Sequence, residues 1–257
     1  MTVTLNLTPT RRAARPLLGA IGVGIAVVLW AAVVGLRLVE GIPGPVDVFS
    51  ALAGQLGTAG LWAATVHTVL VTVAALACAA VAGVLVGAIA GMSVSAGRLL
   101  ASSIDTLRFV PPVALIPVVL LVLGFGVASE IAVAAFAAVW PILLGVATAS
   151  AGLRRRYADV VRVARIGPAR QLRMIYLPGT VPAVVTGIRT GSALALILVI
   201  AVEMLAVPAG LGHEVRFAGD ALALPTMYAN IVWTGLIGVL FDALSRLGDR
   251  LARGTAP

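Results

Sequence analysis

Charged residues divide the chain into long uncharged stretches. Arg15–Arg37 and Asp220–Asp242, for example, each enclose about 20 residues without a formal charge, which is the length that crosses the hydrocarbon core of a bilayer. The pattern predicts an all-α integral membrane protein with about six transmembrane helices. Their predicted limits are 16–36, 61–92, 105–124, 129–152, 187–208 and 225–245.

Two of these stretches do not fit a single uninterrupted span. The uncharged run within Asp47–Arg98 is too long for one span, and glycines interrupt its start. We therefore expect a short interfacial helix over 46–56 before the span over 61–92. The fifth span is predicted to be interrupted by Glu203 and to end at Pro208.

The arginines set the predicted orientation. Nearly all of them fall on one side of the predicted spans, whereas the other side holds only Arg37 and Arg216. Because cytoplasmic loops are enriched in basic residues, both termini are predicted to be cytoplasmic, as tails over 1–15 and 251–257. The first apolar run is interpreted as a retained span, since no small-residue cleavage site follows it.

Composition supports a lipid environment and excludes some functions. Hydrophobic residues make up 61% of the 257 residues and charged residues 11%, against about 45–50% and roughly 25% in soluble domains. The net charge of +8 comes from arginines at the ends of apolar runs, which disfavours nucleic-acid binding. The chain has no lysine, so it cannot form a P-loop, and any ATP it depends on must be hydrolysed by another chain.

Two predicted spans carry patterns of small residues or prolines. Gly83, Gly87 and Gly91 recur every four residues in the second span, which indicates close approach of another helix. The third span contains three prolines, Pro111-Pro112 and Pro117, which break or kink a helix. A broken helix at membrane depth can line a transport pathway or serve packing alone, and the sequence leaves both open.

Ionisable residues inside the spans are the remaining candidates for chemistry. Asp105 and Arg108 are three residues apart and are expected to pair on one helix face. Glu203 could hold an outer gate, contact a delivery protein or pair with a neighbouring helix. Glu130 is placed in an outer loop and His67 is interpreted as a polar anchor, so no metal site is predicted.

The segment over 153–189 is polar, rich in arginine and predicted to be cytoplasmic. It is expected to form a short helix over 157–166, a stop at Gly167, a second helix over 168–176, and a return toward the membrane at two prolines. Such a pair of helices could insert an apolar knob into a partner protein. It could equally lie on anionic lipid, and the residues alone do not decide between these readings.

The same segment resembles the cytoplasmic coupling loop of binding-protein-dependent ABC importer permeases. Gly167, Leu177-Pro178, Pro182 and Gly187-Ile188-Arg189 match the pattern of that loop. There is one departure: where the family has Glu-Ala-Ala, this chain has Val161-Arg162-Val163, and its nearest acidic residue is Asp159.

Further blocks are similar to the nitrate, sulfonate and taurine branch of that family. They are Arg108–Pro117 with Gly124-Phe125-Gly126, and Glu203 with Gly210-Leu211-Gly212. Together with the loop, the resemblance covers about residues 62–250.

The resemblance implies a type I importer fold, with one transmembrane permease domain over 16–250 in the plasma (inner) membrane. The implied partners are a second, identical permease subunit, ATP-binding cassette ATPases that hold ATP and Mg²⁺, and an external substrate-binding protein. No cofactor is expected on this chain, and the implied substrate is a small anion such as nitrate or a sulfonate. The implied ATPase-coupling residues are Asp159, Val161, Arg162, Val163, Arg165, Gly167, Pro168, Ala169, Leu177 and Pro178. The pathway or gate candidates are Arg108, Pro111, Pro112, Pro117 and Glu203.

Two other functions are open to a membrane-spanning chain. A secondary transporter or channel would work without an ATPase, but it calls for internal repeats or a charged relay across the core, and neither is clear in the sequence. A membrane enzyme would need a convergent catalytic set, which the sequence does not offer.

Overall fold

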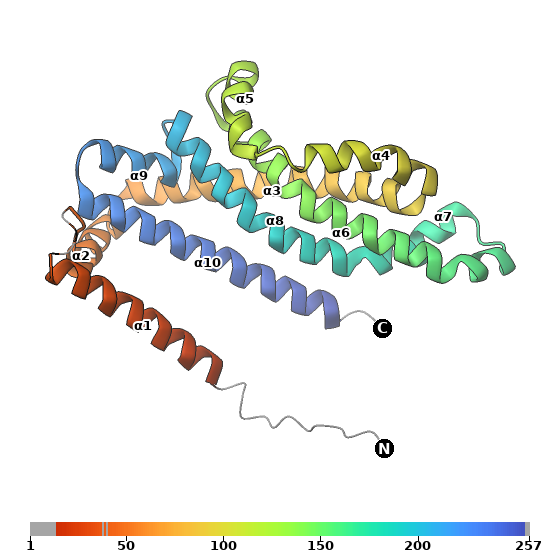
Figure 1. Cartoon of the computed structure of the whole chain (residues 1–257), viewed down its shortest axis with the longest axis horizontal. Coiled ribbons are helices and arrows are strands. Elements are labelled where there is room, and N and C mark those ends of the chain that lie inside the picture. The colour runs from red at the N-terminus through yellow and green to blue at the C-terminus, as the bar shows by residue number, and fades with distance from the viewer. Residues whose placement is uncertain (1–13, 38, 40, 255–257) are drawn as a thin grey trace.

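The computed structural model describes residues 14–37, 39 and 41–254, and that part of the chain is all-α, as predicted (Figure 1). The predicted tail over 1–15 lies outside the described residues except for its last two, and residues 255–257 of the other predicted tail also lie outside them. The α-helices are α1 (Ala14–Gly35), α2 (Pro45–Leu56), α3 (Ala59–Met92), α4 (Val94–Leu107), α5 (Ile116–Leu123), α6 (Val127–Val163), α7 (Pro168–Gln171), α8 (Leu177–Ala206), α9 (Gly210–Asp220) and α10 (Leu224–Gly254). A 3₁₀ turn, η2 (Pro112–Leu115), precedes α5, and a π-helical turn, η3 (Leu172–Tyr176), precedes α8.

Four described helices are long and apolar enough to cross a membrane. They are α3, α6, the stretch Pro168–Ala206 that contains α8, and Leu224–Arg246 within α10. Large apolar side chains such as Leu70, Leu85 and Ile197 are exposed on their outer faces. Since water would penalise these surfaces, the exposed faces are suited to contact with lipid. Helix α1 coincides with the predicted span 16–36, and its apolar part within the described side chains is the shorter Ile21–Gly35.

The predicted third span over 105–124 is broken. Helix α4 ends at Leu107, and η2 and α5 begin after an irregular segment, with the two helical parts bent by 82°. Counting this bent pair as one span raises the number of membrane-capable helices to five. Pro111 and Pro112 have no N–H to donate to a helix, which accounts for the break at this place. Helix α5 consequently projects from the bundle (Figure 1).

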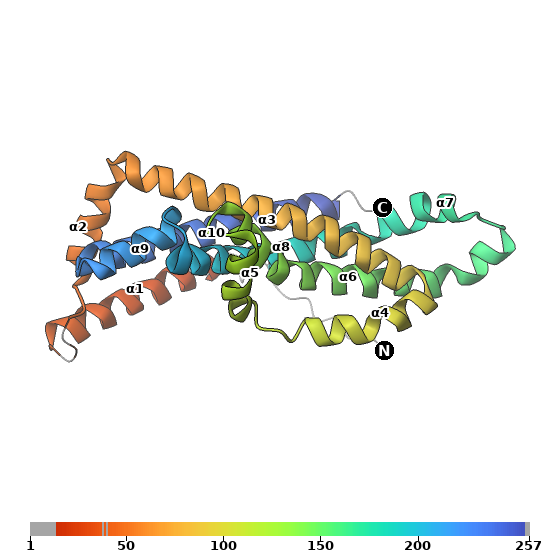
Figure 2. The ribbon, with the colours of Figure 1, turned by 90° about the horizontal axis from the view of Figure 1, so that it is seen from above.

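Helices α3, α6 and α8 form the central core and run side by side in both ribbon views (Figures 1 and 2). Their buried contacts include Ala75, Ala138, Ile142 and Val199. Glycines allow the backbones to come this close. A Cβ at Gly87 would lie 2.5 Å from the Leu143 carbonyl oxygen of α6, which is closer than real Cβ atoms approach. The predicted packing role of the glycine stripe is therefore confirmed.

Helix α8 also contributes small residues to this core, where it packs against both α6 and α3. A Cβ at Gly187 would lie 2.7 Å from the Ile142 Cα, and one at Gly83 of α3 would lie 2.9 Å from the Ile142 Cγ2. Ile142 is therefore enclosed between two glycine surfaces. Because neither glycine can be enlarged without moving a backbone, this contact fixes α3, α6 and α8 relative to one another.

A second buried cluster joins α2, α9 and α10 at one end of the molecule. It includes Val48, Leu52, Leu211 and Ala229. Helix α2 matches the predicted interfacial helix over 46–56. The connection through α7 lies at the opposite end (Figure 1), and α10 runs from the α9 end toward the α7 end. The two ends therefore differ in structure, and each contains a candidate functional site.

Candidate functional site

Helix α6 ends in a Schellman motif that turns the chain at the α7 end. Val163 is the last helical residue. The Arg165 N–H donates to the Arg162 carbonyl at 3.4 Å, and the Ile166 N–H donates to the Val161 carbonyl at 3.1 Å. These two bonds satisfy carbonyl groups that a helix end otherwise leaves without partners.

Arg165 supplies the chain reversal. Its φ of 47° lies in the left-handed region, which glycine or asparagine usually occupies at this position. The predicted separate helix over 157–166, stopped by Gly167, was therefore wrong: these residues form the end of α6, and the chain turns two residues before the glycine. Arginine is an uncommon residue in this conformation, so the sequence carried no signal for it.

Gly167 begins the next element. It is the N-cap of α7, with φ −67° and ψ 158°, a conformation open to any residue. Pro168 follows in the first turn, and the Gln171 side-chain amide donates to the Ile166 carbonyl at 2.7 Å. A Cβ at Gly167 would meet nothing within 4 Å. The packing of this chain alone therefore does not require a glycine here.

The chain continues from α7 into α8 without leaving helical geometry. The π-helical turn η3 joins the two helices, and Pro178 and Pro182 both lie within α8. The prediction that these prolines turn the chain back was wrong. Pro178 directly follows the π-helical turn, so its missing N–H falls where the regular hydrogen-bond ladder of an α-helix is already interrupted.

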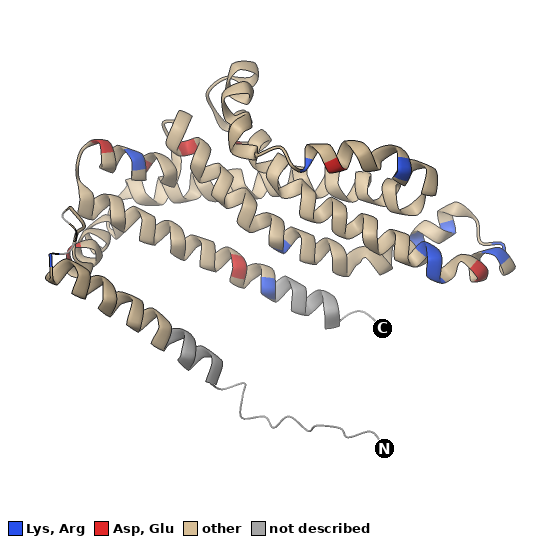
Figure 3. Ribbon diagram, viewed as in Figure 1, with Lys and Arg blue, Asp and Glu red and all other residues tan. Residues whose placement is uncertain are grey.

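The predicted coupling residues are largely exposed. Val161 is half-buried, whereas Val163 is 84% exposed, and the Arg162 guanidinium forms a 3.3 Å ion pair with Asp159 near the tip. Of the predicted set, Arg165, Gly167, Pro168, Ala169, Leu177 and Pro178 are also exposed. Arginines gather at this end of the molecule (Figure 3). Exposed apolar side chains beside positive charges form a surface suited to a partner protein.

The predicted pathway residues Arg108, Pro111, Pro112 and Pro117 lie along the bend between α4 and α5. The Arg108 guanidinium pairs with Asp105 at 3.2 Å, as predicted, and its Cζ lies 4.9 Å from the centre of the Phe109 ring. Pro111 and Pro117 are exposed, and Ile116 alone in this segment is buried against the core. These residues form a surface of the subunit and do not enclose a cavity by themselves.

A groove of about 650 Å³ lies between α6 and α8. Pro141 and Pro182 form part of it, and the exposed residues Thr148, Thr186 and Thr190 contribute hydroxyl groups. No charged residue lines it. This groove was not predicted from the sequence, because its residues come from two spans and do not stand out within either one.

Glu203 is fully buried near the end of α8, where it caps helix α9. Its Oε1 accepts a 2.7 Å hydrogen bond from the Thr68 hydroxyl of α3, and its Oε2 accepts a 2.8 Å bond from the Gly212 N–H. The Leu211 N–H donates to the Thr68 Oγ1 at 2.9 Å. The N-terminal N–H groups of α9 therefore face a buried carboxylate, which suits the positive end of a helix dipole.

This arrangement explains the glycines of the Gly210-Leu211-Gly212 block. Gly210 has a φ of +88°, and a Cβ there would overlap the Glu203 carboxylate. A Cβ at Gly212 would lie 2.8 Å from the Glu203 Cβ and would overlap the Ile200 carbonyl oxygen. Of the roles proposed for Glu203, the structure places it in contact with neighbouring helices.

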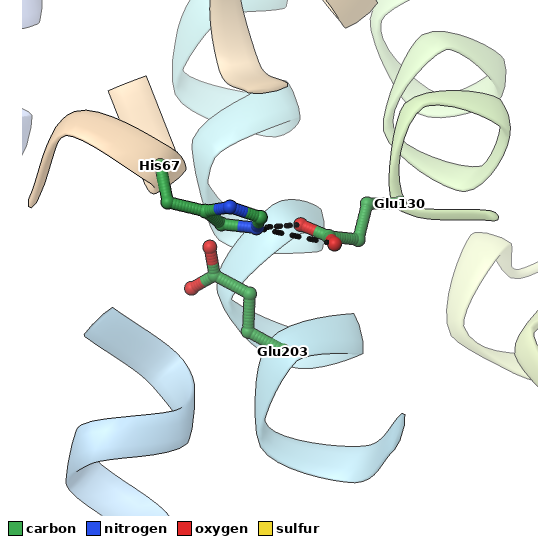
Figure 4. A group of neighbouring side chains, drawn as sticks. All are labelled: His67, Glu130 and Glu203. Carbon is green, nitrogen blue, oxygen red and sulfur yellow. Dashed lines mark hydrogen bonds and ion pairs between the residues drawn. The ribbon is translucent and has the colours of Figure 1, made fainter. Parts of the chain in front are cut away.

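His67 and Glu130 complete a cluster with Glu203 (Figure 4). The His67 Nε2 lies 3.2 and 3.3 Å from the two Glu130 carboxylate oxygens, and one possible ligand atom from each of the three residues lies within 4.8 Å of the others. Glu130 is fully buried in the first turn of α6, so its predicted place in an outer loop was wrong. The available signal was that all three residues were predicted near the outer ends of different spans.

Comparison with known proteins identifies the family. The model described as "Binding-protein-dependent transport system inner membrane component" matches residues 79–254, which is more than half of the chain. The chain belongs to this family. The predicted resemblance to ABC importer permeases of the nitrate, sulfonate and taurine branch is confirmed.

Relatives of this family member are named as transport proteins. The chain is 34% identical over 177 residues to the nitrate import permease protein NrtB of Synechococcus elongatus, an alignment that covers 67% of this chain and 63% of the relative. It is 29% identical to the taurine transport system permease protein TauC of Escherichia coli, covering 85% and 82%. The chain thus aligns with less than two thirds of the nitrate permease's length.

The fold of this permease family member also matches a solved structure. The MetNI methionine ABC transporter, in inward-facing conformations, superimposes with a TM-score of 0.64 at 17% identity, covering 75% of this chain and 94% of the other. The predicted ABC importer permease fold is therefore confirmed.

Proposed function

We propose that this chain is the membrane subunit of an ATP-binding cassette importer, and that the α6–α8 connection docks a separate ATPase subunit. The observation behind the proposal is that this connection combines exposed apolar side chains, such as Val163 and Leu177, with arginines at one end of the molecule. These are the features by which a helical knob enters a complementary groove. The ATPase would hold ATP and Mg²⁺, so this chain has no catalytic role.

The docked end would face the cytoplasm, in agreement with its arginines and the positive-inside rule, and both termini would lie on that side of the plasma (inner) membrane. Where the family has Glu-Ala-Ala this chain has Val161-Arg162-Val163, so the acidic residue is missing at Val161 and the expected contacts change. Arg165, and Arg162 once released from its ion pair with Asp159, would find acidic partners on the ATPase. The α9 end would then face the external binding protein.

The groove between α6 and α8 is proposed as one wall of the transport pathway. Two copies of the chain would pair around it, with the exposed apolar residues of α5, Leu121 and Val122, available for contact between subunits or with lipid. The hydroxyls of Thr148 and Thr186 could donate hydrogen bonds to an anion without holding it by a full charge, whereas the Thr190 hydroxyl donates to the Thr186 carbonyl. Nitrate is a small anion and taurine carries an anionic sulfonate group, and both are named in the relatives, so we propose a substrate with a small anionic group.

The docking role is tested by adding a negative charge to the exposed connection between α6 and α8. Val163→Asp adds a carboxylate to an 84% exposed position, and Gly167→Asp adds one where a side chain has open space. Neither change should disturb folding. With the chain co-expressed with ABC ATPase subunits of its own genome, we expect at least a tenfold loss of co-purified ATPase for either variant.

The matched control is Val46→Asp, which changes an 80% exposed valine of α2 at the opposite end of the molecule. It should retain wild-type amounts of ATPase. If all three variants co-purify as much ATPase as the wild type does, docking through this connection is contradicted. Anion uptake by the purified chain alone in liposomes would instead favour an ATP-independent transporter.

A further inference from the structure

The cluster of His67, Glu130 and Glu203 is separate from both the α6–α8 groove and the proposed docking surface. Its three side chains come from α3, α6 and α8, the helices that make up the central core (Figure 4). Both carboxylates are fully buried, and His67 is partly exposed. Three residues far apart in sequence therefore direct polar atoms to one point between three tightly packed helices.

The hydrogen bonds within the cluster are unequal. Glu203 receives one hydrogen on each oxygen, from Thr68 and from Gly212. Within the described part of the chain, Glu130 receives hydrogens only from His67, whose single Nε2 faces both of its oxygens at 3.2 and 3.3 Å. One nitrogen can supply one hydrogen, so a fully buried carboxylate is left with unused acceptor capacity directed into the cluster.

The charges of the cluster are also unbalanced. Among the described residues, no arginine forms an ion pair with either carboxylate, and His67 is the one basic group in contact with Glu130. Two carboxylates held close together in a buried site repel one another unless a cation or a proton lies between them. The site therefore favours a ligand that carries positive charge and accepts electron pairs.

We propose that His67, Glu130 and Glu203 bind one divalent transition-metal ion, of the class that zinc represents. An imidazole nitrogen and carboxylate oxygens are ligands that zinc takes at about 2.0–2.2 Å, and two ligand atoms of a tetrahedral site then lie roughly 3.4 Å apart. The 3.2 Å distance between the His67 Nε2 and Glu130 fits that spacing. His67 binds as the neutral imidazole with its proton on Nδ1.

The ion acts as a structural tie. It links α3, α6 and α8 at the α9 end, and Glu203 carries the link on to α9 through Gly212. A water or another oxygen donor would supply the fourth ligand of a tetrahedral site. Neither the groove nor the α7 end contributes to this site, so the proposal does not depend on docking or on the identity of the substrate.

The test measures zinc binding to the purified full chain in detergent. After treatment with a chelator, zinc is titrated by calorimetry and the bound metal is measured by mass spectrometry. We expect one zinc per chain and a higher unfolding temperature with zinc than with chelator. His67→Gln and Glu130→Gln should each weaken zinc binding at least tenfold.

The matched controls are His213→Gln and Glu214→Gln, which alter the chain's other histidine and its neighbour at the same end of the molecule. Both should bind zinc as the wild type does. If a cluster variant fails to fold, the wild-type protein with cobalt remains informative, because tetrahedral nitrogen and oxygen ligation has a distinct absorption spectrum. Less than a tenth of a zinc per wild-type chain, or binding that His213→Gln removes, would overturn the proposal.

Discussion

Replacement of Thr68 by valine tests how the α9 end is held together. The Thr68 hydroxyl is fully buried, donates to the Glu203 Oε1 at 2.7 Å and accepts from the Leu211 N–H at 2.9 Å. Valine has nearly the same shape without the hydroxyl. The change therefore removes both bonds at once, and it leaves a buried carboxylate oxygen and a buried N–H without these partners.

Both losses can be assigned magnitudes. A hydrogen bond to a charged group contributes about 1.5–3 kcal/mol, and a buried N–H left without a partner costs about 1–3 kcal/mol. Taking the lower end of each range, we expect Thr68→Val to reduce the free energy of unfolding by about 2.5–3 kcal/mol, or roughly 100-fold in the unfolding equilibrium. Thr68→Ser keeps the hydroxyl and should lose much less.

The matched control is Thr72→Val, one helical turn further along α3. Thr72 is also fully buried, but its hydroxyl donates at 2.7 Å to the Thr68 carbonyl of its own helix and to no other element. The assay is unfolding in detergent followed by tryptophan fluorescence, with size-exclusion chromatography to confirm folding. If Thr68→Val and Thr72→Val lose equal stability, the link from Thr68 to Glu203 and α9 does not stabilise this end as argued.

Two further substitutions, one at a glycine of α3 and one at Trp233, are tested by the same unfolding assay. Gly91→Ala places a Cβ that overlaps the Ala147 carbonyl oxygen, and it should reduce the free energy of unfolding by about 1–3 kcal/mol. The control Gly152→Ala adds a Cβ that has nothing within 4 Å, so it should be neutral or slightly stabilising. Equal effects of the two changes would contradict the packing argument. Trp233→Phe removes the 2.9 Å bond from the indole N–H to the Thr65 Oγ1 and part of the edge-to-face contact with Trp62, and should cost about 1–2 kcal/mol; unchanged stability would show that neither contact stabilises this end.

The helices were predictable where charge and hydropathy change together. The helix over 46–56 and the span over 61–92 were predicted close to α2 and α3, because polar or glycine-rich turns separate uncharged runs there. The stripe of Gly83, Gly87 and Gly91 also predicted correctly that another backbone packs closely. These features depend on local sequence or on one helix face, so no knowledge of the partner helix was needed.

Helix ends at the α7 end were not predictable, because they depend on backbone conformations that the residue types do not favour. Arg165 adopts the left-handed conformation usually taken by glycine, and Pro178 lies inside a helix after a π-helical turn. A reading based on glycine and proline therefore placed the stops at the wrong residues. The residues expected to couple were nonetheless found on one exposed connection, where their role stays a prediction.

The buried cluster was missed for a different reason. His67 and Glu130 are 63 residues apart in the sequence and belong to different spans, so no spacing rule connects them. Each was judged alone, and each alone resembled an ordinary polar residue at a membrane boundary. Comparing the depth of polar residues across all predicted spans would have grouped them with Glu203.

Helix α6 connects the two ends of the molecule. Glu130 lies in its first turn and Val163 is its last residue, so one helix of 37 residues reaches from the buried cluster to the proposed docking surface. Pro141 removes one of its internal hydrogen bonds near the middle and would by itself weaken it there. The next residue, Ile142, is enclosed by glycines of α3 and α8, so the weak point is also closely packed. Because close-packed interiors transmit displacement, a movement imposed at Val163 is expected to shift α6 together with α3 and α8.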